Sequence, residues 1–355
     1  MSIAPNNDPT TEDARLPSAH DTLMYAEAAQ TAEVVATQFA RNESVIATLA
    51  EDLRRNPPPF VATCARGSSD HAATYAKYLF ETQLGIVTAS ASPSVGSVYE
   101  AKQKLEGALY LVISQSGKSP DLLRNAEAAR EAGARVVALV NVEDSPLAQL
   151  AHTVVPLHAG PERSVAATKS YLSSLSAILQ LAANWKNEAP LLDALEVLPD
   201  SLRAAWQADW SPLTEGLVDA HNLFVLGRGL GLAAAQEAAL KFKETCGLHA
   251  EAYSSAEVKH GPMALVGPGS PVLCFAQPDE TEAGMLALAR EFRTRGAEVW
   301  VSSAHGELPL VRASHPACAP LLTIQSFYRT INTLALRRGH NPDVPPHLNK
   351  VTETV

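Results

Sequence analysis

The sequence predicts an α/β protein in which parallel sheets are covered by helices on both faces, built as two tandem units. Short apolar runs alternate along the chain with longer amphipathic stretches, which is the pattern of such folds. Some residue pairs also recur at a fixed spacing of 162 positions, which indicates an internal duplication. With 355 residues and 46% hydrophobic content, the chain is long enough for two domains with buried cores.

Eight short apolar runs are the predicted strands, five in the first half and three in the second. They are Phe60–Cys64, Ile86–Ala89, Leu109–Ser114, Val136–Asn141 and Thr153–Leu157, then Leu223–Leu226, Val272–Phe275 and Val299–Ser302. Helices are expected in most gaps, including Leu122–Ala132. The alanine-rich, tryptophan-bearing stretch Asn187–Leu217 separates the two groups and is predicted to be a helical linker.

The predicted organisation is a mobile polar tail over residues 1–22, a first domain over 23–200, a second over 201–340 and a C-terminal tail over 341–355. The first segment is polar and contains proline, unlike a targeting peptide. The longest apolar stretches, such as Leu172–Trp185, contain polar residues and are too short to span a membrane. We therefore expect a cytoplasmic protein.

The duplication is visible in residues that follow equivalent strands. Arg66-Gly67 in the first half corresponds to Arg228-Gly229 in the second, and Gln115 corresponds to Gln277. The copies differ around these glutamines, because Ser114-Gln115-Ser116 becomes Ala276-Gln277-Pro278. We therefore expect only the first copy to retain a hydroxyl-lined binding loop.

Charge and cysteine usage exclude several classes of partner. The formal net charge is -10 and no Lys/Arg-rich run is present, which argues against nucleic acid or an anionic membrane as a partner. The four cysteines occur singly among mostly apolar neighbours: Cys64, Cys246, Cys274 and Cys318. They are predicted to be buried reduced thiols, neither disulfides nor zinc ligands.

The loop after the third predicted strand is typical of a phosphate site. Residues 110–121 read Tyr-Leu-Val-Ile-Ser-Gln-Ser-Gly-Lys-Ser-Pro-Asp, so a strand leads into hydroxyl and amide side chains before a helix N-terminus. The spacing is not that of a nucleotide-binding loop, and it suits a small phosphate ester. Serines are also common turn and cap residues, so this loop alone is ambiguous. A second turn, Gly67-Ser68-Ser69-Asp70, opens onto the same sheet edge and strengthens the prediction.

A second candidate region supplies acid–base groups. Glu237, Lys241 and Glu244 are spaced by four and three, which places them on one helix face. Such a stripe is more often a set of solvated ion pairs. A polar turn containing Lys259-His260-Gly261-Pro262 follows, and a histidine with an ordinary pKa of about 6.5 suits proton transfer. Other histidines, such as His71, His152 and His221, lack this context and are predicted to be structural or exposed.

In combination these motifs resemble a known family over roughly residues 25–355. The sequence is similar to the double sugar-isomerase (SIS) module of glucosamine-6-phosphate synthase. The resemblance lies in the loop 113–117, the run 237–244, the segment 249–253, the turn 259–262 and the tail 348–352. It implies a flavodoxin-like three-layer sandwich for each half and a ketose or aldose 6-phosphate as ligand.

Departures from the synthase pattern suggest a related reaction. The synthase carries an N-terminal glutaminase domain, whereas this chain opens Met1-Ser2-Ile3 and soon reaches the isomerase module. Without channelled ammonia, removal of an amino group is the expected direction, as in SIS-type glucosamine-6-phosphate deaminases. Family members commonly carry Arg-Asn-Leu-Ala-Lys where this chain has Pro-His-Leu-Asn-Lys at 346–350, and a frequent serine is Ala167 here. Both changes would affect substrate choice.

The resemblance also implies roles for individual residues. Glu244 would move the proton between C2 and C1, His260 would open the sugar ring, Lys241 would stabilise charge at O1 or O2, and Lys350 would close the site or form an imine. Phosphate is expected on Ser69, Ser114, Gln115, Ser116 and Ser119, and the rest of the substrate beside Gly67, Ser68 and Val165. No metal or cofactor is expected. A homodimer is implied, in which the His260 turn reaches the neighbouring subunit's site and the C-terminal tail closes each site.

Two other readings remain open. The first is another SIS enzyme, such as a galactosamine-6-phosphate deaminase or a deglycase acting on a 6-phosphorylated fructosamine. The second is a non-catalytic phosphosugar sensor, as in some transcription regulators. The sensor is less favoured because both Glu244 and His260 are present and the N-terminal tail has no room for a DNA-binding helix-turn-helix domain.

Overall fold

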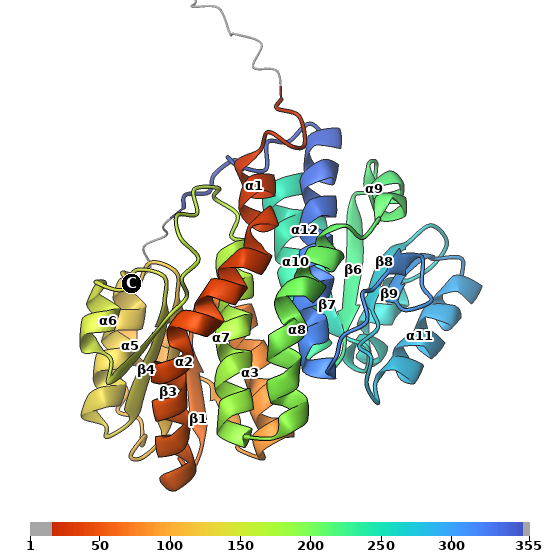
Figure 1. Cartoon of the computed structure of the whole chain (residues 1–355). Coiled ribbons are helices and arrows are strands. Elements are labelled where there is room, and N and C mark those ends of the chain that lie inside the picture. The colour runs from red at the N-terminus through yellow and green to blue at the C-terminus, as the bar shows by residue number, and fades with distance from the viewer. Residues whose placement is uncertain (1–15, 351–355) are drawn as a thin grey trace, which may run out of the picture.

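The computed structural model describes residues 16–350 and contains two parallel five-stranded sheets (Figure 1). The first sheet has the order β2-β1-β3-β4-β5. Its strands are β1 Val61–Cys64, β2 Thr88–Ser90, β3 Leu109–Ser114, β4 Arg135–Val140 and β5 Thr153–Pro156. The second sheet has the order β10-β9-β8-β6-β7. Its strands are β6 Asn222–Gly227, β7 His249–Ser254, β8 Pro271–Phe275, β9 Glu298–Ser303 and β10 Leu308–Pro309.

The two sheets have the same topology, so the predicted duplication is confirmed. Read from its other edge, the second sheet runs β7-β6-β8-β9-β10, which matches the order of the first strand by strand. All paired strands in both sheets are parallel. The α/β class and the two tandem flavodoxin-like sandwiches predicted from the sequence are therefore confirmed.

Helices pack on both faces of each sheet. They are α1 Leu23–Ala29, α2 Thr31–Arg55, α3 Ser68–Leu84, α4 Pro93–Ser97, α5 Pro120–Glu131, α6 Pro146–Leu150, α7 Lys169–Lys186, α8 Ala189–Trp206, α9 Ser211–Leu217, α10 Gly231–Cys246, α11 Glu282–Thr294 and α12 Ala319–Arg337. Three short 3₁₀ helices are η1 Glu257–His260, η2 Pro262–Leu265 and η3 Pro316–Cys318.

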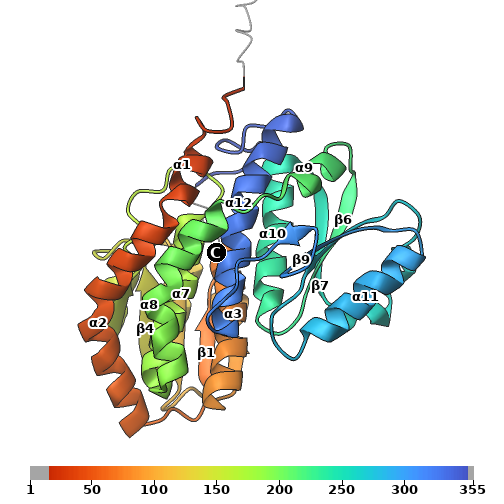
Figure 2. The ribbon, with the colours of Figure 1, turned by 45° about the vertical axis from the view of Figure 1, so that its right-hand side comes forward.

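A shared helical layer lies between the two sheets (Figures 1 and 2). The largest hydrophobic core joins residues of both sheets, such as Leu109 and Val225, with residues of α2, α3, α7, α8, α10 and α12. Helices α5 and α6 cover the outer face of the first sheet, and α11 covers that of the second. Burying both faces explains why most strands are continuous apolar runs.

All eight predicted strands are present, but β7 and β10 were not predicted. β7 reads His-Ala-Glu-Ala-Tyr-Ser and lies at a sheet edge, where only Ala250 is buried, so it lacks an apolar run. β10 has only two residues. Edge strands that are partly exposed give weaker sequence signals than buried central ones.

The predicted helical linker is helical, yet its main helix belongs to the core. α8 packs against α2 and α12, and buries an apolar stripe that includes Leu191, Leu198 and Leu202. Its hydrophobic spacing is that of an amphipathic helix, which requires a packing partner.

The predicted N-terminal tail is also shorter than expected. Residues 1–15 lie outside the described part of the chain, but Thr22 is fully buried. Its Oγ1 caps α1 by accepting from the Tyr25 backbone N–H at 3.2 Å, and it donates to Asn332 Oδ1 at 2.7 Å. Thr22 is therefore anchored to α12, far away in the sequence.

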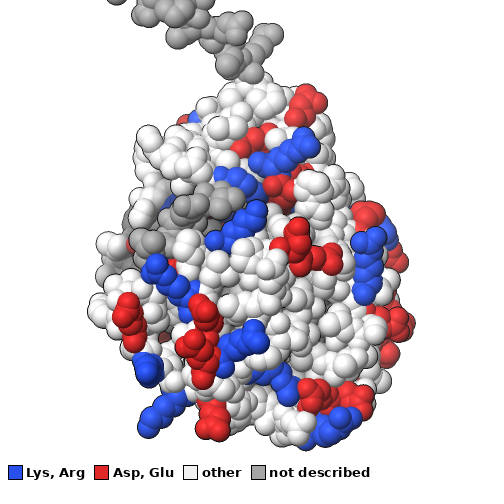
Figure 3. All heavy atoms as spheres, turned by 90° about the vertical axis from the view of Figure 1, so that its left-hand side faces the viewer, with Lys and Arg blue, Asp and Glu red and all other residues white. Residues whose placement is uncertain are grey.

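The surface and the thiols agree with the sequence analysis where the structure describes them. On the face shown in Figure 3, acidic and basic side chains are interspersed. The four cysteines are free and buried, and burial raises the pKa of Cys64 to about 11. Within residues 16–350 no helix combines the length and apolar character needed to cross a membrane.

Candidate active site

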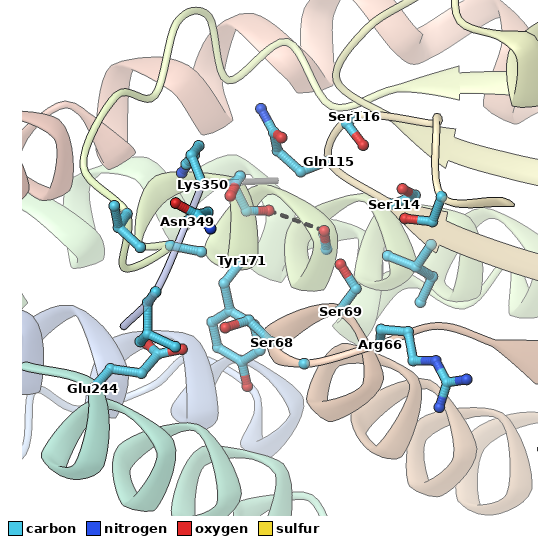
Figure 4. Close-up of a pocket in the computed structure, with 18 of the residues that line it drawn as sticks. Arg66, Ser68, Ser69, Ser114, Gln115, Ser116, Tyr171, Glu244, Asn349 and Lys350 are labelled. Atoms are coloured by element: carbon cyan, nitrogen blue, oxygen red, sulfur yellow. Dashed lines mark hydrogen bonds between the residues drawn. The ribbon is translucent and has the colours of Figure 1, made fainter. Parts of the chain in front are cut away.

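A cavity of about 360 Å³ lies at the carboxyl edge of the first sheet and is completed by the second half of the chain. Every residue to which the family resemblance assigned a role in the site lines it, except His260. These residues are Gly67, Ser68, Ser69, Ser114, Gln115, Ser116, Ser119, Val165, Lys241, Glu244 and Lys350. The structure therefore brings the two hydroxyl-rich turns and the acid–base helix together in one place (Figure 4).

The serine loop after β3 is held by its own side chains. Ser114 Oγ accepts a hydrogen bond from the Gly117 backbone N–H at 3.0 Å, which folds the loop back on itself. Gly117 has a φ of +63°, and a Cβ at this position would lie 2.2 Å from Ser145 Oγ. Only glycine fits this turn, because a side chain would be both strained and in collision.

Three helix N-termini point at the cavity. Ser68 and Ser69 begin α3, Ser119 is the N-cap of α5, and Ser170 lies in the first turn of α7. Gly67, with a φ of +55°, allows the chain to turn from β1 into α3. Converging positive helix ends and serine hydroxyls form a site for a small anion.

Opposite the serine loops, α10 presents an ion-pair stripe. Lys241 Nζ lies 2.5 Å from Glu244 Oε2 and 3.3 Å from Glu237 Oε1, so one ammonium separates two carboxylates. Burial acts to lower the pKa of Lys241, but Glu237 and Glu244 outweigh it and raise the pKa overall. Glu244 lines the cavity with its side chain 21% exposed, whereas the Glu237 side chain is fully buried. Figure 4 shows Glu244 across the cavity from Ser114 and Ser116.

Glu237 connects this stripe to the first half of the chain. It accepts hydrogen bonds from Ser68 Oγ and Tyr328 OH, each at 3.1 Å, and its Oε2 lies 2.9 Å from His71 Nδ1. Burial acts to raise the pKa of Glu237, but Lys241 and His71 hold it below the ordinary value. His71 was predicted to be structural or exposed, and its contact with α10 was not predicted.

The C-terminal segment forms a further wall through Leu348, Asn349 and Lys350. Lys350 Nζ donates to Glu162 Oε2 at 2.9 Å and to the Ser164 carbonyl at 2.8 Å. Burial acts to raise the pKa of Glu162, but the Lys350 ammonium and hydrogen bonds from Ser170 lower it overall. This buried ion pair fixes the segment against the cavity.

His260 is not brought into the cavity of its own chain. It is exposed at the end of η1, beyond the edge strand β7 of the second sheet. The family resemblance implies that the His260 turn reaches the neighbouring subunit's site, and here His260 does not line the cavity that contains Glu244. Its contribution to a neighbouring subunit's site stays a prediction from the family resemblance.

Several residues around the cavity were not predicted. Arg66 lines its mouth, with Nε and an Nη each 2.8 Å from Asp121 Oδ2, and Asn349 precedes Lys350 on the tail wall. α7 contributes Ser170, Tyr171 and Ser174. The spacing of the two α7 serines by four residues was a usable signal, because it places both hydroxyls on one helix face. Within residues 16–350 no cluster of three or more His, Cys, Asp or Glu residues forms a candidate metal site.

Several known proteins are similar to this chain in sequence. The chain is 32% identical over 306 residues to glutamine–fructose-6-phosphate aminotransferase (isomerizing) of Sulfurisphaera tokodaii, a match covering 82% of this chain and 49% of that protein. The chain thus spans about half the length of the curated relatives it matches.

Two solved structures extend the comparison. A structure from Silicibacter pomeroyi DSS-3, described as a proposed phosphosugar isomerase, is 45% identical with a TM-score of 0.87 and covers 91% of this chain and 100% of its own. Glucosamine-6-phosphate deaminase from Thermotoga maritima has a TM-score of 0.71 at 23% identity, covering 92% and 100%. At that identity the second likeness shows a shared fold alone.

The SIS domain family matches residues 61–184 and 216–324. The first match runs from β1 to α7, and the second runs from α9 to α12. The two matched regions therefore coincide with the two sheets and their helices, and the chain belongs to the SIS domain family.

Proposed function

We propose that this protein is a glucosamine-6-phosphate deaminase, converting glucosamine 6-phosphate and water to fructose 6-phosphate and ammonia. One observation carries the proposal: a single cavity has serine hydroxyls beside helix N-termini at one end and the Glu244–Lys241 pair at the other. A sugar held by its 6-phosphate at the first end extends toward a carboxylate at the second. Substrate positioning of this kind supplies much of the catalytic effect in such reactions.

The phosphate group binds where the helix N-termini converge. Ser69, Ser114, Ser116 and Ser119 supply hydroxyl donors, and Gln115 supplies an amide. Hydrogen bonds to a charged phosphate are stronger than neutral ones, so few lysines are needed in a chain of net charge -10. Gly67, Ser68 and Val165 line the remaining wall beside the sugar.

Glu244 is the proposed base for proton transfer. It takes the proton from C2 of the open-chain amino sugar and returns it to C1, while the C1 aldehyde oxygen gains a proton, so an enolamine becomes a ketimine. Water then adds to C2 of the ketimine, and ammonia leaves. Lys241 lines the cavity beside Glu244, and its ammonium is assigned to stabilise the negative charge that develops at O1.

Ring opening is assigned to His260 of the partner subunit in a homodimer. A histidine can move a proton between O1 and O5 at neutral pH. The support is indirect: His260 lies outside the cavity of its own chain, on an exposed 3₁₀ helix that a second copy can approach.

The contacts of Lys350 favour a closing role over imine formation. Its ammonium is committed to Glu162 and to the Ser164 carbonyl, which are charged and polar acceptors. An imine requires a neutral amine free to attack a carbonyl carbon. A substrate that already carries its nitrogen at C2 needs no such lysine, which supports deamination.

Isomerisation of a phosphosugar without loss of nitrogen is the second candidate. The 45% identical structure is described as a proposed phosphosugar isomerase, and the same serine loops and Glu244 would serve that reaction. Deglycation of a 6-phosphorylated fructosamine would use them as well. The three reactions differ in what they release: deamination releases ammonia from C2, deglycation releases an amine from C1, and isomerisation releases nothing.

An assay of ammonia release separates these functions. Purified protein is incubated with glucosamine 6-phosphate, galactosamine 6-phosphate, N-acetylglucosamine 6-phosphate and a 6-phosphofructosamine, and ammonia, free amine, ketose phosphate and aldose phosphate are quantified together. We expect equal amounts of ammonia and fructose 6-phosphate from glucosamine 6-phosphate. Glucose 6-phosphate is the parallel substrate for isomerisation, and its turnover without any ammonia release from the amino sugars would overturn the deaminase proposal.

A further inference from the structure

A continuous row of polar contacts leads from the cavity back to His71. Glu244 lies 2.5 Å from Lys241 Nζ, Lys241 Nζ lies 3.3 Å from Glu237 Oε1, and Glu237 Oε2 lies 2.9 Å from His71 Nδ1. The proposed mechanism uses only the first two of these residues. The row crosses between the two halves of the chain, since His71 is on α3 and the other three are on α10.

The two oxygens of Glu237 have separate partners. Oε1 faces Ser68 Oγ at 3.1 Å, Tyr328 OH at 3.1 Å and Lys241 Nζ at 3.3 Å. Within residues 16–350, His71 is the one hydrogen-bond partner of Oε2. His71 therefore holds the carboxylate oxygen that the other three partners do not contact, and it helps to set the direction in which Oε1 points.

The chemistry of the contact defines the histidine tautomer. An ionised carboxylate only accepts hydrogen bonds, and Glu237 is held ionised by Lys241 and His71 against the effect of burial. Nδ1 of His71 must therefore carry the proton that it donates. The His71 side chain is 19% exposed, while Glu237 is fully buried, so the histidine covers the carboxylate on its outer side.

Ser68 and Lys241 both depend on this carboxylate. Lys241 Nζ donates to Ser68 Oγ at 3.1 Å, and Ser68 Oγ in turn donates to Glu237 Oε1. Both Ser68 and Lys241 line the cavity. A carboxylate free to rotate would release the lysine and the serine together, at the point where the two halves of the chain meet.

We propose that His71 is a positioning residue, which orients Glu237 so that Lys241 and Ser68 are held in place for the substrate. The inference rests on the proposed function for its kinetic consequence, but its geometric part stands on these contacts alone. Through this histidine, the helix that begins at the phosphate site also controls the placement of the acid–base groups on α10.

Two substitutions at position 71 separate positioning from mere packing. His71→Asn keeps a side-chain N–H close to the place of Nδ1, and His71→Ala removes the donor. His221→Ala is the matched control, because His221 is exposed and lies just before β6, at the amino end of the second sheet. For each protein, kcat and KM are measured with glucosamine 6-phosphate, and the Kd of glucitol 6-phosphate, an unreactive open-chain analogue, is measured by calorimetry.

We expect His71→Ala to lower kcat by up to about 10²-fold, as small displacements of catalytic groups do, and to weaken analogue binding. His71→Asn should restore most of both, and the control should match the parent. A purely structural histidine would lower the melting temperature without changing kcat, KM or Kd. That result would overturn the proposal.

A crystal structure of unliganded His71→Ala gives a readout that needs no activity. The separation of Lys241 Nζ from Ser68 Oγ, 3.1 Å here, should lengthen in this variant and return in His71→Asn. If the parent protein turned over no phosphosugar, the proposed function would fail and this comparison would still decide the role of His71. An unchanged separation in His71→Ala would contradict it.

Discussion

The two halves of the molecule share a topology but contribute different side chains to the cavity. Strand order is the same in both sheets, and the glycine after the first strand of each half has almost the same backbone angle, with φ of +55° at Gly67 and +54° at Gly229. Equivalent helices follow these turns, and α3 packs against α10. Yet α3 lines the cavity with its first residues, whereas α10 lines it with Lys241 and Glu244, near the end of the helix.

The loops after β3 and β8 differ in their hydroxyl side chains. In the first copy Ser114 and Ser116 line the cavity, and in the second their counterparts are Ala276 and Pro278. The side chain of Gln277 is buried and donates to the Pro316 carbonyl at 2.6 Å, so it supports the fold. The two copies therefore share a scaffold, while only the loop of the first copy lines the cavity with serine hydroxyls.

The largest effect is expected at the base supplied by the second half. Glu244→Gln should lower kcat by about 10²–10⁴-fold, the usual contribution of a general base, while leaving phosphosugar binding largely intact. The measurement is ammonia release beside calorimetric binding of glucosamine 6-phosphate. Glu215→Gln, at an exposed position on α9, is the control. Turnover at the parental rate in Glu244→Gln would show that the base lies elsewhere.

The phosphate loop of the first half should give an effect on binding. Ser116→Ala should weaken substrate affinity by about 1–3 kcal/mol, or about 5–150-fold in Kd, through loss of one charge-assisted hydrogen bond. Calorimetric titration with glucosamine 6-phosphate provides the value. Unchanged affinity would mean that the phosphate sits outside the loop that distinguishes the two copies.

The Glu162–Lys350 ion pair should stabilise the C-terminal segment, which forms a wall of the cavity outside both sheets. Glu162→Gln should lower the free energy of unfolding by about 2 kcal/mol near neutral pH, because it removes charged hydrogen bonds. The pKa of Glu162 is held below its ordinary value of 4.5, so its stabilisation is complete above pH 4.5 and is lost as pH falls through the folded-state pKa.

The free energies of unfolding of the parent and of Glu162→Gln, measured with denaturant between pH 3 and 7, should therefore become more similar as the pH falls. A difference between the two free energies of unfolding that stayed constant over this range, or widened as the solution became more acidic, would contradict the assigned ion pair.

The smallest effect is expected from restoring hydroxyls to the second copy. Ala276→Ser with Pro278→Ser should change phosphosugar affinity and stoichiometry by less than about 2-fold, because Gln277 remains committed to the Pro316 carbonyl. Calorimetry with glucosamine 6-phosphate reports both quantities. A second binding event per chain would show that hydroxyls alone create the site, and the comparison of the two copies would need revision.

The sequence predicted features that follow from local pattern and sheet geometry. Leu109–Ser114 was predicted with the bounds that the structure has, because a strand buried on both faces must be apolar throughout. The serine turns at residues 67–70 and 114–119 were placed together because parallel strands end at a common edge. The helical face of Glu237, Lys241 and Glu244 followed from spacing alone.

Features that depend on long-range packing were not predictable. Glu162 lies in an irregular segment, and only the fold shows that its carboxylate is buried against Lys350, 188 positions away. His71 meets Glu237 across 166 positions, and nothing near His71 in the sequence indicates that contact. The placement of His260 outside the cavity likewise depends on β7, an edge strand that was not predicted because it lacks a continuous apolar run.

The anchoring of the first helix bears on how the protein is made by the ribosome. Thr22 is bonded to Asn332, and the first backbone N–H groups of α1, at Leu23 and Met24, donate to the carboxylate of Asp343 at 2.7 Å each. Since domains generally fold in order of synthesis, the first sheet can assemble early while α1 waits for its partners. The first helix thus reaches its final contacts only after the ribosome has added Asn332 and Asp343, which lie 310 and 320 positions beyond Thr22 and Leu23.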